Sequence, residues 1–197
     1  MTTHDVTDDT FIWLEEIYGE KPLEWVAEQN ERTRKMLQTP RFAETERRIL
    51  EVLDSDDRIP MVAKQGDYYY NFWKDVDHPR GIWRRTTLDS YRTSEPAWEL
   101  LLDLDALGKA EGTAWVWAGA DLLHPDYTRA LLELSPDGGD AVAVREIDLN
   151  AKAFVEDGFV LTAAKTGVSW IDRDTIFVAP DFGPGTMTTS SYPRQVK

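Results

Sequence analysis

The sequence contains no cysteine and relatively few cations. With no cysteine among its 197 residues, the chain offers no disulfide, no thiol nucleophile and no cysteine-based zinc site. Lysine and arginine number 22 against 36 aspartates and glutamates, which gives a formal net charge of −14. A nucleic-acid surface needs a basic face, so this balance argues against nucleic acid as a partner.

Long hydrophobic runs are also missing. No run reaches the roughly 18 consecutive apolar residues of a transmembrane helix, so the sequence predicts no membrane partner. The first ten residues, MTTHDVTDDT, are polar and acidic, and they lack the basic segment and apolar run of a secretory signal. We therefore expect a cytoplasmic protein.

Aromatic residues, by contrast, are abundant. The chain has 8 tryptophans, 7 tyrosines and 7 phenylalanines, and 42% of its residues are hydrophobic, which is enough for a sizeable core. Aromatic side chains suit a pleated, half-buried surface. The composition therefore favours a protein rich in β-sheet.

The first part of the chain carries a helical pattern. Pro22 suits the first position of a helix, and apolar or small residues recur after it at spacings of three and four as far as Leu37. After Thr39 and Pro40, a second helix is expected from Arg41 to about Leu53.

From Ile59 the pattern changes to short runs rich in β-branched and aromatic residues, separated by turn-forming residues. The first set reads MVAKQ, DYYYNFWKD, GIWRRTTL and WELLLDLD, and two further sets follow. Such runs predict antiparallel sheets. Their loose repetition favours a β-propeller, while a β-sandwich also gives short strands at this spacing. The pattern by itself leaves both architectures open.

Several long stretches of the sequence resemble those of one protein family. The stretch DYYYNFWKDVDHPRGIWRRTTLDSY (67–91) resembles the first propeller blade of prolyl oligopeptidase-type serine peptidases, and residues 111–149 and 152–197 continue the likeness. The stretch FIWLEEIYGEKPLEWVAEQNERTRKML (11–37) is similar to the N-terminal segment of that family. Where the family pattern has glycine before Tyr-Pro-Arg, this sequence has Ser191, a local departure in a loop.

The resemblance implies a parent protein in two parts. In this family a seven-bladed propeller covers an α/β-hydrolase domain, whose Ser-Asp-His triad cleaves short peptides, typically after proline. The propeller admits only small substrates, the N-terminal helices pack against the hydrolase, and the triad follows the propeller in the chain.

The resemblance also implies the organisation of this chain, which would be mainly β. An N-terminal helical segment at 1–57 would precede an incomplete propeller at 58–197, with about two to three of seven four-stranded antiparallel blades. Blade one would cover about 58–105, blade two about 113–150, and blade three would begin at about 158.

The chain would then end inside the propeller. Its partners would be the α/β-hydrolase domain of the same parent protein and, through that domain, short peptides, and open blade edges would favour self-association. The alternative is an independent acidic β-sheet binding domain with no link to peptidases.

No serine or histidine lies in a catalytic sequence motif. Gly167–Ile171 approaches Gly-x-Ser-x-Gly but lacks the last glycine and lies in a strand run. Ser190–Ser191 suits a turn. His4 lies in the terminal segment, His78 and His124 each precede proline in a predicted loop, and no two histidines have metal-ligand spacing.

The acidic residues occur in short groups. Glu15–Glu16, Asp54–Asp57 and the pair Asp172 and Asp174 are the groups that could serve acid–base chemistry or hold a hard cation. Asp172 and Asp174 resemble a fragment of a calcium loop, but the glycine and the final glutamate of that motif are missing. We interpret them as solvated turn residues.

Glycine pairs and an arginine pair complete the candidates. Gly138–Gly139 and Gly183–Gly185 are interpreted as turns that need positive φ. Arg84 and Arg85 follow Trp83 and suit either a substrate carboxylate or a strand pair with one stem lying along a ring; we favour the latter. We therefore predict no catalytic, cofactor-binding or metal-binding residue, and no peptidase activity from this chain alone.

Overall fold

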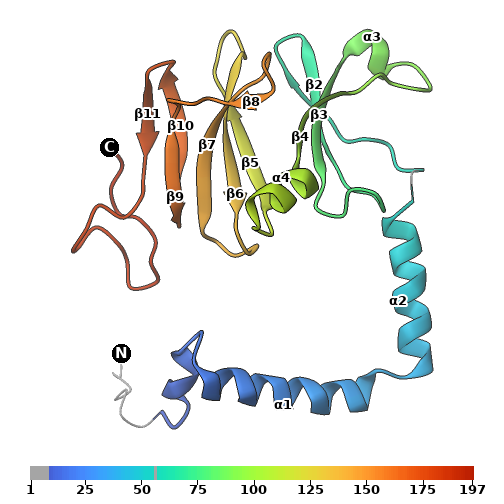
Figure 1. Cartoon of the computed structure of the whole chain (residues 1–197), viewed down its shortest axis with the longest axis vertical. Coiled ribbons are helices and arrows are strands. Elements are labelled where there is room, and N and C mark those ends of the chain that lie inside the picture. Colours follow the sequence, from blue (N-terminus) through green and yellow to red (C-terminus); the bar gives the residue numbers. More distant parts are fainter. Residues whose placement is uncertain (1–8, 56) are drawn as a thin grey trace, which may run out of the picture. The chain divides into compact units, whose positions relative to one another are not determined.

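The computed structural model describes residues 9–55 and 57–197. The chain forms two compact units, which meet in the sequence between Leu53 and Asp54. The first unit is helical and the second consists mainly of antiparallel sheets. Figure 1 shows the elements of both units along the chain.

The first unit contains a short 3₁₀ helix, η2 (Ile12–Glu15), followed by α1 (Glu20–Leu37) and α2 (Pro40–Leu53). The Trp13 ring from η2 packs edge-on against Trp25 of α1, with ring centres 6.2 Å apart. This contact secures η2 against α1.

The predicted helix boundaries are close to those observed. α1 begins two residues before Pro22, which therefore lies third in the helix. Pro22 still falls in the first turn, where its missing N–H has no intrahelical partner to lose. α2 begins at Pro40, and the hydroxyl of Thr39 accepts a hydrogen bond from the N–H of Phe42 at 3.3 Å. This N-terminal cap separates the two helices.

The second unit begins with a four-stranded antiparallel sheet in the order β1-β2-β3-β4. Its strands are β1 (Ala63–Gln65), β2 (Tyr68–Trp73), β3 (Ile82–Thr87) and β4 (Glu99–Asp103). A short helix, α3 (Leu88–Tyr91), follows β3, and α4 (Leu104–Glu111) follows β4.

A second sheet has five strands. They are β5 (Val116–Leu122), β6 (Arg129–Ser135), β7 (Val142–Asp148), β8 (Ala153–Phe154) and β9 (Val160–Ala164). The order is β5-β6-β7-β8, and β9 also pairs with β7. The segment predicted to open a third blade at about 158 therefore adds its strand to the second sheet.

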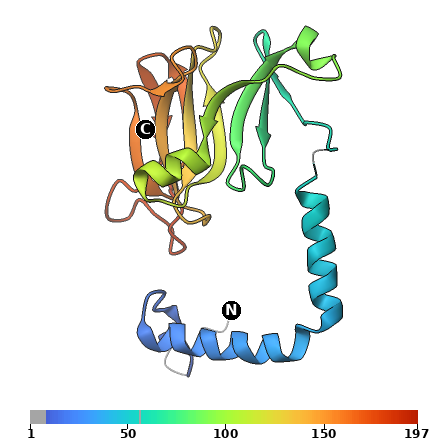
Figure 2. The same ribbon diagram turned by 45° about the vertical axis from the view of Figure 1, so that its right-hand side comes forward.

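A third sheet contains β10 (Val168–Asp172) and β11 (Thr175–Val178). Figures 1 and 2 show the three sheets of this unit following one another in a row, whereas a sandwich has two layers. A hydrogen bond links the second sheet to the third. The indole N–H of Trp170 in β10 donates to the carbonyl of Asp121 in β5 at 2.9 Å.

The main core lies between the first and second sheets. Its fully buried members come from β6, β7 and the segments that follow β4 and β7, and they include Leu104, Leu132, Leu134, Ile147 and Leu149. Alternation along β6 turns every second side chain into this core. The apolar runs of the sequence thus form the contact between two sheets.

Residues 192–197 do not form a regular strand. Pro193 forms only an isolated antiparallel bridge with Met187. Beyond it, Lys197 exchanges two backbone hydrogen bonds with Val178 of β11, at 2.9 and 3.0 Å. The bridge at Pro193 is flanked by backbone hydrogen bonds from Thr188 N–H to the Tyr192 carbonyl and from Arg194 N–H to the Thr186 carbonyl, both at 2.8 Å.

Candidate functional site

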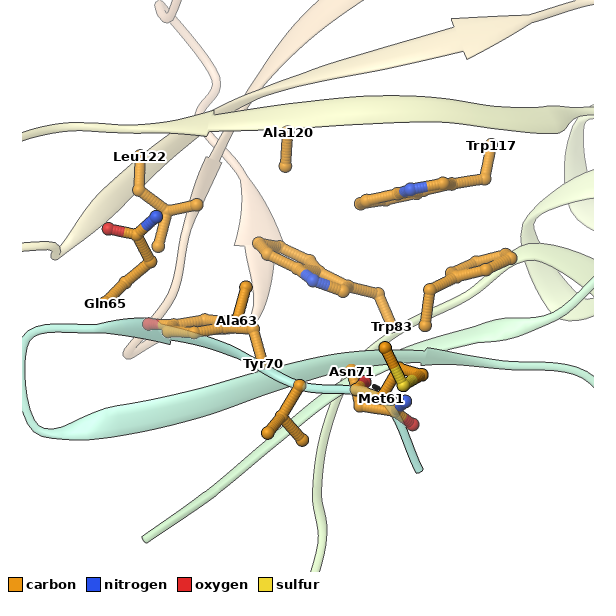
Figure 3. A pocket seen from close by; sticks show the side chains of 11 residues that line it. Met61, Ala63, Gln65, Tyr70, Asn71, Trp83, Trp117, Ala120 and Leu122 are labelled. Carbon is orange, nitrogen blue, oxygen red and sulfur yellow. Dashed lines mark hydrogen bonds between the residues drawn. The ribbon is translucent and has the colours of Figure 1, made fainter. Parts of the chain in front are cut away.

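A cleft of about 390 Å³ lies between the first two sheets. Side chains from β2 and β3 face β5 across it, as Figure 3 shows. The lining is largely apolar and comprises Met61, Val62, Ala63, Gln65, Tyr70, Asn71, Phe72, Trp83, Trp117, Ala120 and Leu122.

Four aromatic rings form a continuous row beside this cleft. Phe72 stacks on Trp117 with ring centres 5.0 Å apart, Trp117 lies 5.3 Å from Trp83, and Trp83 lies 5.6 Å from Tyr70. Tyr70 and Phe72 share a face because side chains alternate along a strand, and Trp83 is the cross-strand partner of Phe72. The row gives the cleft a rigid aromatic wall suited to an apolar ring or side chain.

A buried arginine lies at one end of this row. Arg85 donates through Nη1 to the Tyr70 hydroxyl at 3.5 Å and through Nη2 to the Leu149 carbonyl at 3.3 Å. Burial raises the pKa of Tyr70. The hydrogen bond from Arg85 lowers the pKa of Glu99, so this carboxyl stays ionised as the counter-ion of the arginine.

Arg84 and Arg85 occupy opposite faces of the first sheet. Arg85 lies over the Tyr68 ring, with Cζ 4.1 Å from its centre. Arg84 instead contacts the rings of Trp73 and Trp98, with Cζ at 4.7 and 4.3 Å from their centres. The interpretation as a strand pair is therefore confirmed, and each of the two guanidinium groups, rather than one stem, lies over an aromatic ring.

The structure does not assemble the predicted serine and histidine candidates into a triad. Ser169 lies within β10 opposite Phe177. His78 Nδ1 lies 2.9 Å from Asp75 Oδ1 in the connection between β2 and β3, whereas His124 packs against the ring of Tyr127. Within residues 9–55 and 57–197, no serine hydroxyl is hydrogen-bonded to a histidine ring. His4 lies outside the described residues.

The terminal serine pair belongs to a turn. Ser190 Oγ lies 3.1 Å from Thr188 Oγ1, and Ser191 adopts a positive φ of 63°. The left-handed conformation of Ser191 explains why glycine suits this position in the family pattern.

The acidic groups remain separate. Asp172 caps the turn between β10 and β11 by accepting the N–H of Asp174 at 3.0 Å. In the described part of the chain, no three acidic or histidine side chains gather into a metal-binding group. Glu15–Glu16 and Asp54–Asp57 do not join such a group there, and Asp56 itself lies outside the described residues.

Both glycine motifs lie in turns, and the predicted positive φ is found at Gly138, Gly183 and Gly185 but not at Gly139. Gly138 has φ of 84° between β6 and β7, and its N–H is held by the Ser135 hydroxyl at 2.9 Å. Gly183 and Gly185 also have positive φ, at 107° and 83°. These positions need glycine for the backbone conformation.

The aromatic cleft was not found from the sequence. Its strands were recognisable, but Trp117 and Tyr70 lie on different sheets, and only their packing brings them together. The high density of aromatic residues in DYYYNFW was a signal in the sequence, but it placed rings on both faces of the strand and did not mark this one.

Adjacent antiparallel sheets joined by an aromatic and aliphatic core define this unit as part of a β-propeller domain. A family model described as the N-terminal β-propeller domain of prolyl oligopeptidase matches residues 1–191. The chain therefore belongs to the prolyl oligopeptidase family, in agreement with the resemblance found in its sequence. This membership overturns the alternative of a β domain unrelated to peptidases.

Two curated relatives are uncharacterized peptidases. One, from Sinorhizobium fredii, is 43% identical over 187 residues, which is 93% of this chain and 26% of the relative. The other, from Rickettsia prowazekii, is 34% identical over 194 residues, which is 93% of this chain and 27% of the relative. The chain thus spans about a quarter of the length of these relatives.

Solved structures show the same fold. A post-proline cleaving enzyme from Rickettsia typhi matches with a TM-score of 0.85 and 33% identity, over 93% of this chain and 28% of that one. Oligopeptidase B from Leishmania major matches with a TM-score of 0.62 and 12% identity, over 95% of this chain and 26% of that one. The second match shows the fold alone.

None of the helices in residues 9–55 and 57–197 combines the length and the hydropathy that a bilayer crossing demands.

Proposed function

We propose that this chain is the N-terminal and first propeller part of a prolyl oligopeptidase-like serine endopeptidase. In this proposal the propeller controls the access of short peptides to an α/β-hydrolase domain of the parent protein, and that domain supplies the catalytic triad. The chain contributes the filter and none of the bond-breaking chemistry. A cytoplasmic location remains part of the proposal.

One observation carries this proposal. The post-proline cleaving enzyme of Rickettsia typhi superposes on 93% of the chain with a TM-score of 0.85 at 33% identity. The described residues hold no serine bonded to a histidine, which accords with a catalytic centre elsewhere. The likeness to this enzyme supports a role of the chain in the positioning and filtering of peptides.

The first unit supports docking onto the hydrolase domain. Apolar residues of α2 are unusually exposed, with Ile49 at 55% and Val52 at 70%. They lie on an amphipathic helix whose polar side carries an ion pair between Arg47 and Glu51. An apolar helix face of this kind needs a partner surface, and the hydrolase domain is the one the family supplies.

The sheets suggest blade limits for the second unit. Blade one corresponds to β1–β4, blade two to β5–β9, and blade three begins at β10. In this division each of the first two blades has at least four strands, as a propeller requires.

Size selectivity in the parent protein tests the gating role. The Trp117→Ala variant removes a ring that stacks on Phe72 and packs at a tilt against Trp83 between the first two sheets. A looser propeller should raise kcat/KM for long proline-containing peptides relative to short ones. An unchanged ratio in a folded variant would contradict gating.

The absence of chemistry in this chain is tested separately. The purified chain should not turn over a chromogenic proline peptide, and a serine-directed phosphonate should label none of its serines. Turnover accompanied by labelling would overturn the assignment.

A further inference from the structure

The strongest unassigned feature is the surroundings of Arg84, on the face of the first sheet opposite the aromatic cleft. The guanidinium lies between Trp73 and Trp98, with Cζ 4.7 and 4.3 Å from the two ring centres. Aromatic faces attract a cation and hold its plane flat. The two rings therefore restrict the orientation of the guanidinium.

A buried amide holds the same guanidinium from the strand side. Arg84 Nε donates to Asn71 Oδ1 at 2.8 Å, and Asn71 Nδ2 donates to the carbonyl of Met61 at 2.8 Å. Asn71 is only 4% exposed. Among the described residues, the two terminal nitrogens of Arg84 donate no hydrogen bond, so Nε is the one nitrogen of this guanidinium that has an acceptor there.

A cleft of about 640 Å³ adjoins Arg84. Its lining comprises Arg58, Ile59, Pro60, Trp73, Asp75, Arg84, Tyr91, Thr93, Ser94, Pro96 and Trp98. Arg58 adds a second cation, with Cζ 4.4 Å from the centre of the Trp73 ring. Its Nε donates to the carbonyl of Ser55 at 3.0 Å.

The one acidic residue in this lining, Asp75, already accepts hydrogen bonds from neighbouring residues. Asp75 accepts hydrogen bonds from the Trp73 indole at 2.9 Å, from the His78 backbone at 2.7 Å and from His78 Nδ1 at 2.9 Å. Among the described residues, no carboxylate lies within ion-pair distance of Arg84. Burial lowers the pKa of Arg84 below the ordinary arginine value, while the charge of Asp75, which lies beyond ion-pair distance, acts in the opposite direction.

This environment is unusual for the chain. Other partly buried arginines of the second unit have carboxylate partners, as in the pairs Arg85–Glu99, Arg129–Glu146 and Arg145–Glu111. The chain carries 36 acidic residues against 22 basic ones, so acidic partners are plentiful. An oriented arginine with an open planar fork matches the geometry of an external carboxylate.

We propose that the Arg84 cleft binds a carboxylate group of a peptide, either its C-terminus or an Asp or Glu side chain. The terminal nitrogens of Arg84 would donate two parallel hydrogen bonds, and Arg58 would supply a second positive charge. That the carboxylate belongs to a peptide rests on the proposed function, whereas the carboxylate chemistry rests on the cleft itself.

A titration of the chain with three acetylated tetrapeptides tests this site. The first has neutral side chains and a free C-terminus, the second is the same peptide as an amide, and the third is an amide containing one glutamate. The indole N–H signals of Trp73 and Trp98 provide the NMR readout, with the Trp98→Phe variant assigning one of them. The first or third peptide should shift these signals, and the neutral amide should not.

Two substitutions locate the effect. Arg84→Gln should weaken the binding by about ten-fold or more, because hydrogen bonds from a charged donor are lost. Arg92→Gln removes the same charge at an exposed position outside the lining and should leave binding unchanged. A near-UV circular dichroism spectrum establishes that each variant is folded.

The outcomes are distinct. Binding of the free C-terminus alone, or of the glutamate peptide alone, supports the site and identifies the source of the carboxylate. Equal shifts with all three peptides, no shift with any, or full binding by folded Arg84→Gln would overturn it. If Arg84→Gln does not fold, the wild-type contrast between acid and amide decides, with Arg58→Gln as the second variant.

This test is independent of the gating proposal. Failure to bind carboxylates would leave the size selectivity of the parent peptidase unaffected. Conversely, carboxylate binding that persists when gating fails would assign the cleft to a ligand other than a substrate.

Discussion

The Nε of Arg85 lies 2.6 Å from Oε2 of Glu99, directly across the β3–β4 ladder. The side chains are 6% and 32% exposed. Lys152, which follows β7 in the second sheet, also reaches Glu99, with Nζ 3.0 Å from Oε1. The Lys152–Glu99 ion pair and the hydrogen bond from Arg85 to the Leu149 carbonyl therefore connect the first sheet to the second.

Replacing Arg85 should weaken the whole sheet unit. Arg85→Met keeps much of the stem but removes the donor to the buried carbonyl of Leu149 and leaves the carboxylate of Glu99 with Lys152 alone. We expect a loss of about 2–4 kcal/mol in the free energy of unfolding at pH 7. Urea denaturation measures it, and Arg173→Met, which breaks a half-exposed pair with Asp126, is the matched control. Equal losses of stability in the two variants would show that the contacts of Arg85 with Glu99 and Leu149 contribute no more than a surface ion pair.

Glu133 should lower the stability of the folded state in a pH-dependent way. Burial, aided by the charge of Asp121, raises its pKa. A raised carboxyl pKa means that the folded state binds the proton more tightly than the unfolded state. Stability should therefore fall as the pH rises from the unfolded value near 4.5 through the higher folded value.

The Glu133→Gln variant isolates this effect. It should be more stable than the wild type at pH 7, and the difference should shrink as the pH falls below the unfolded value. Thermal unfolding across pH 3–8 is the measurement, with the exposed Glu156→Gln as control. A destabilised Glu133→Gln at neutral pH would show that the ionised carboxylate makes a favourable contact.

The core between the first two sheets should depend on Leu132. This side chain is fully buried, and Leu132→Ala should cost about 2–5 kcal/mol because it leaves a cavity. Leu100 of β4, which is 48% exposed, provides a control in the same unit. Chemical denaturation should show a much smaller loss for Leu100→Ala, and similar losses would place the main core elsewhere.

The open third sheet should promote self-association. Phe177 of β11 is 50% exposed, and Ile171 of β10 is equally exposed. Unpaired strand edges with apolar side chains favour pairing between chains. Light scattering after gel filtration should show concentration-dependent oligomers, and Phe177→Lys should reduce them.

Val76→Lys is the control for this prediction, because Val76 is exposed but lies in the connection between β2 and β3. A wild-type chain that stays monodisperse and monomeric at all concentrations would contradict the expectation.

Local pattern predicted the elements of this chain well where the chemistry is local. The break at Thr39 and Pro40 located the boundary between two helices, since a hydroxyl cap and a missing N–H act over one turn. The turn at Gly138 was likewise recognisable, because only glycine adopts its backbone conformation without strain. The long words carrying the family resemblance also allowed the partial propeller to be anticipated.

The strand pairing was less predictable. β9 was expected to open a new blade, yet it pairs with β7. Backbone hydrogen bonds are the same for every residue type, so an isolated strand does not specify its neighbour. Side-chain packing across faces decides that choice.

The amino-acid sequence by itself determined the helical and sheet segments, the turns, the acidic charge and the family, because these depend on local propensity and on extended words. Only the tertiary structure decided that Arg84 and Arg85, which are adjacent in the sequence, contact different partners on opposite faces of the sheet. Alternation of the pleat sends Arg85 toward Glu99 and the core, and Arg84 toward Trp73 and Trp98. The partners of each arginine come from distant positions, and no local pattern encodes such convergence.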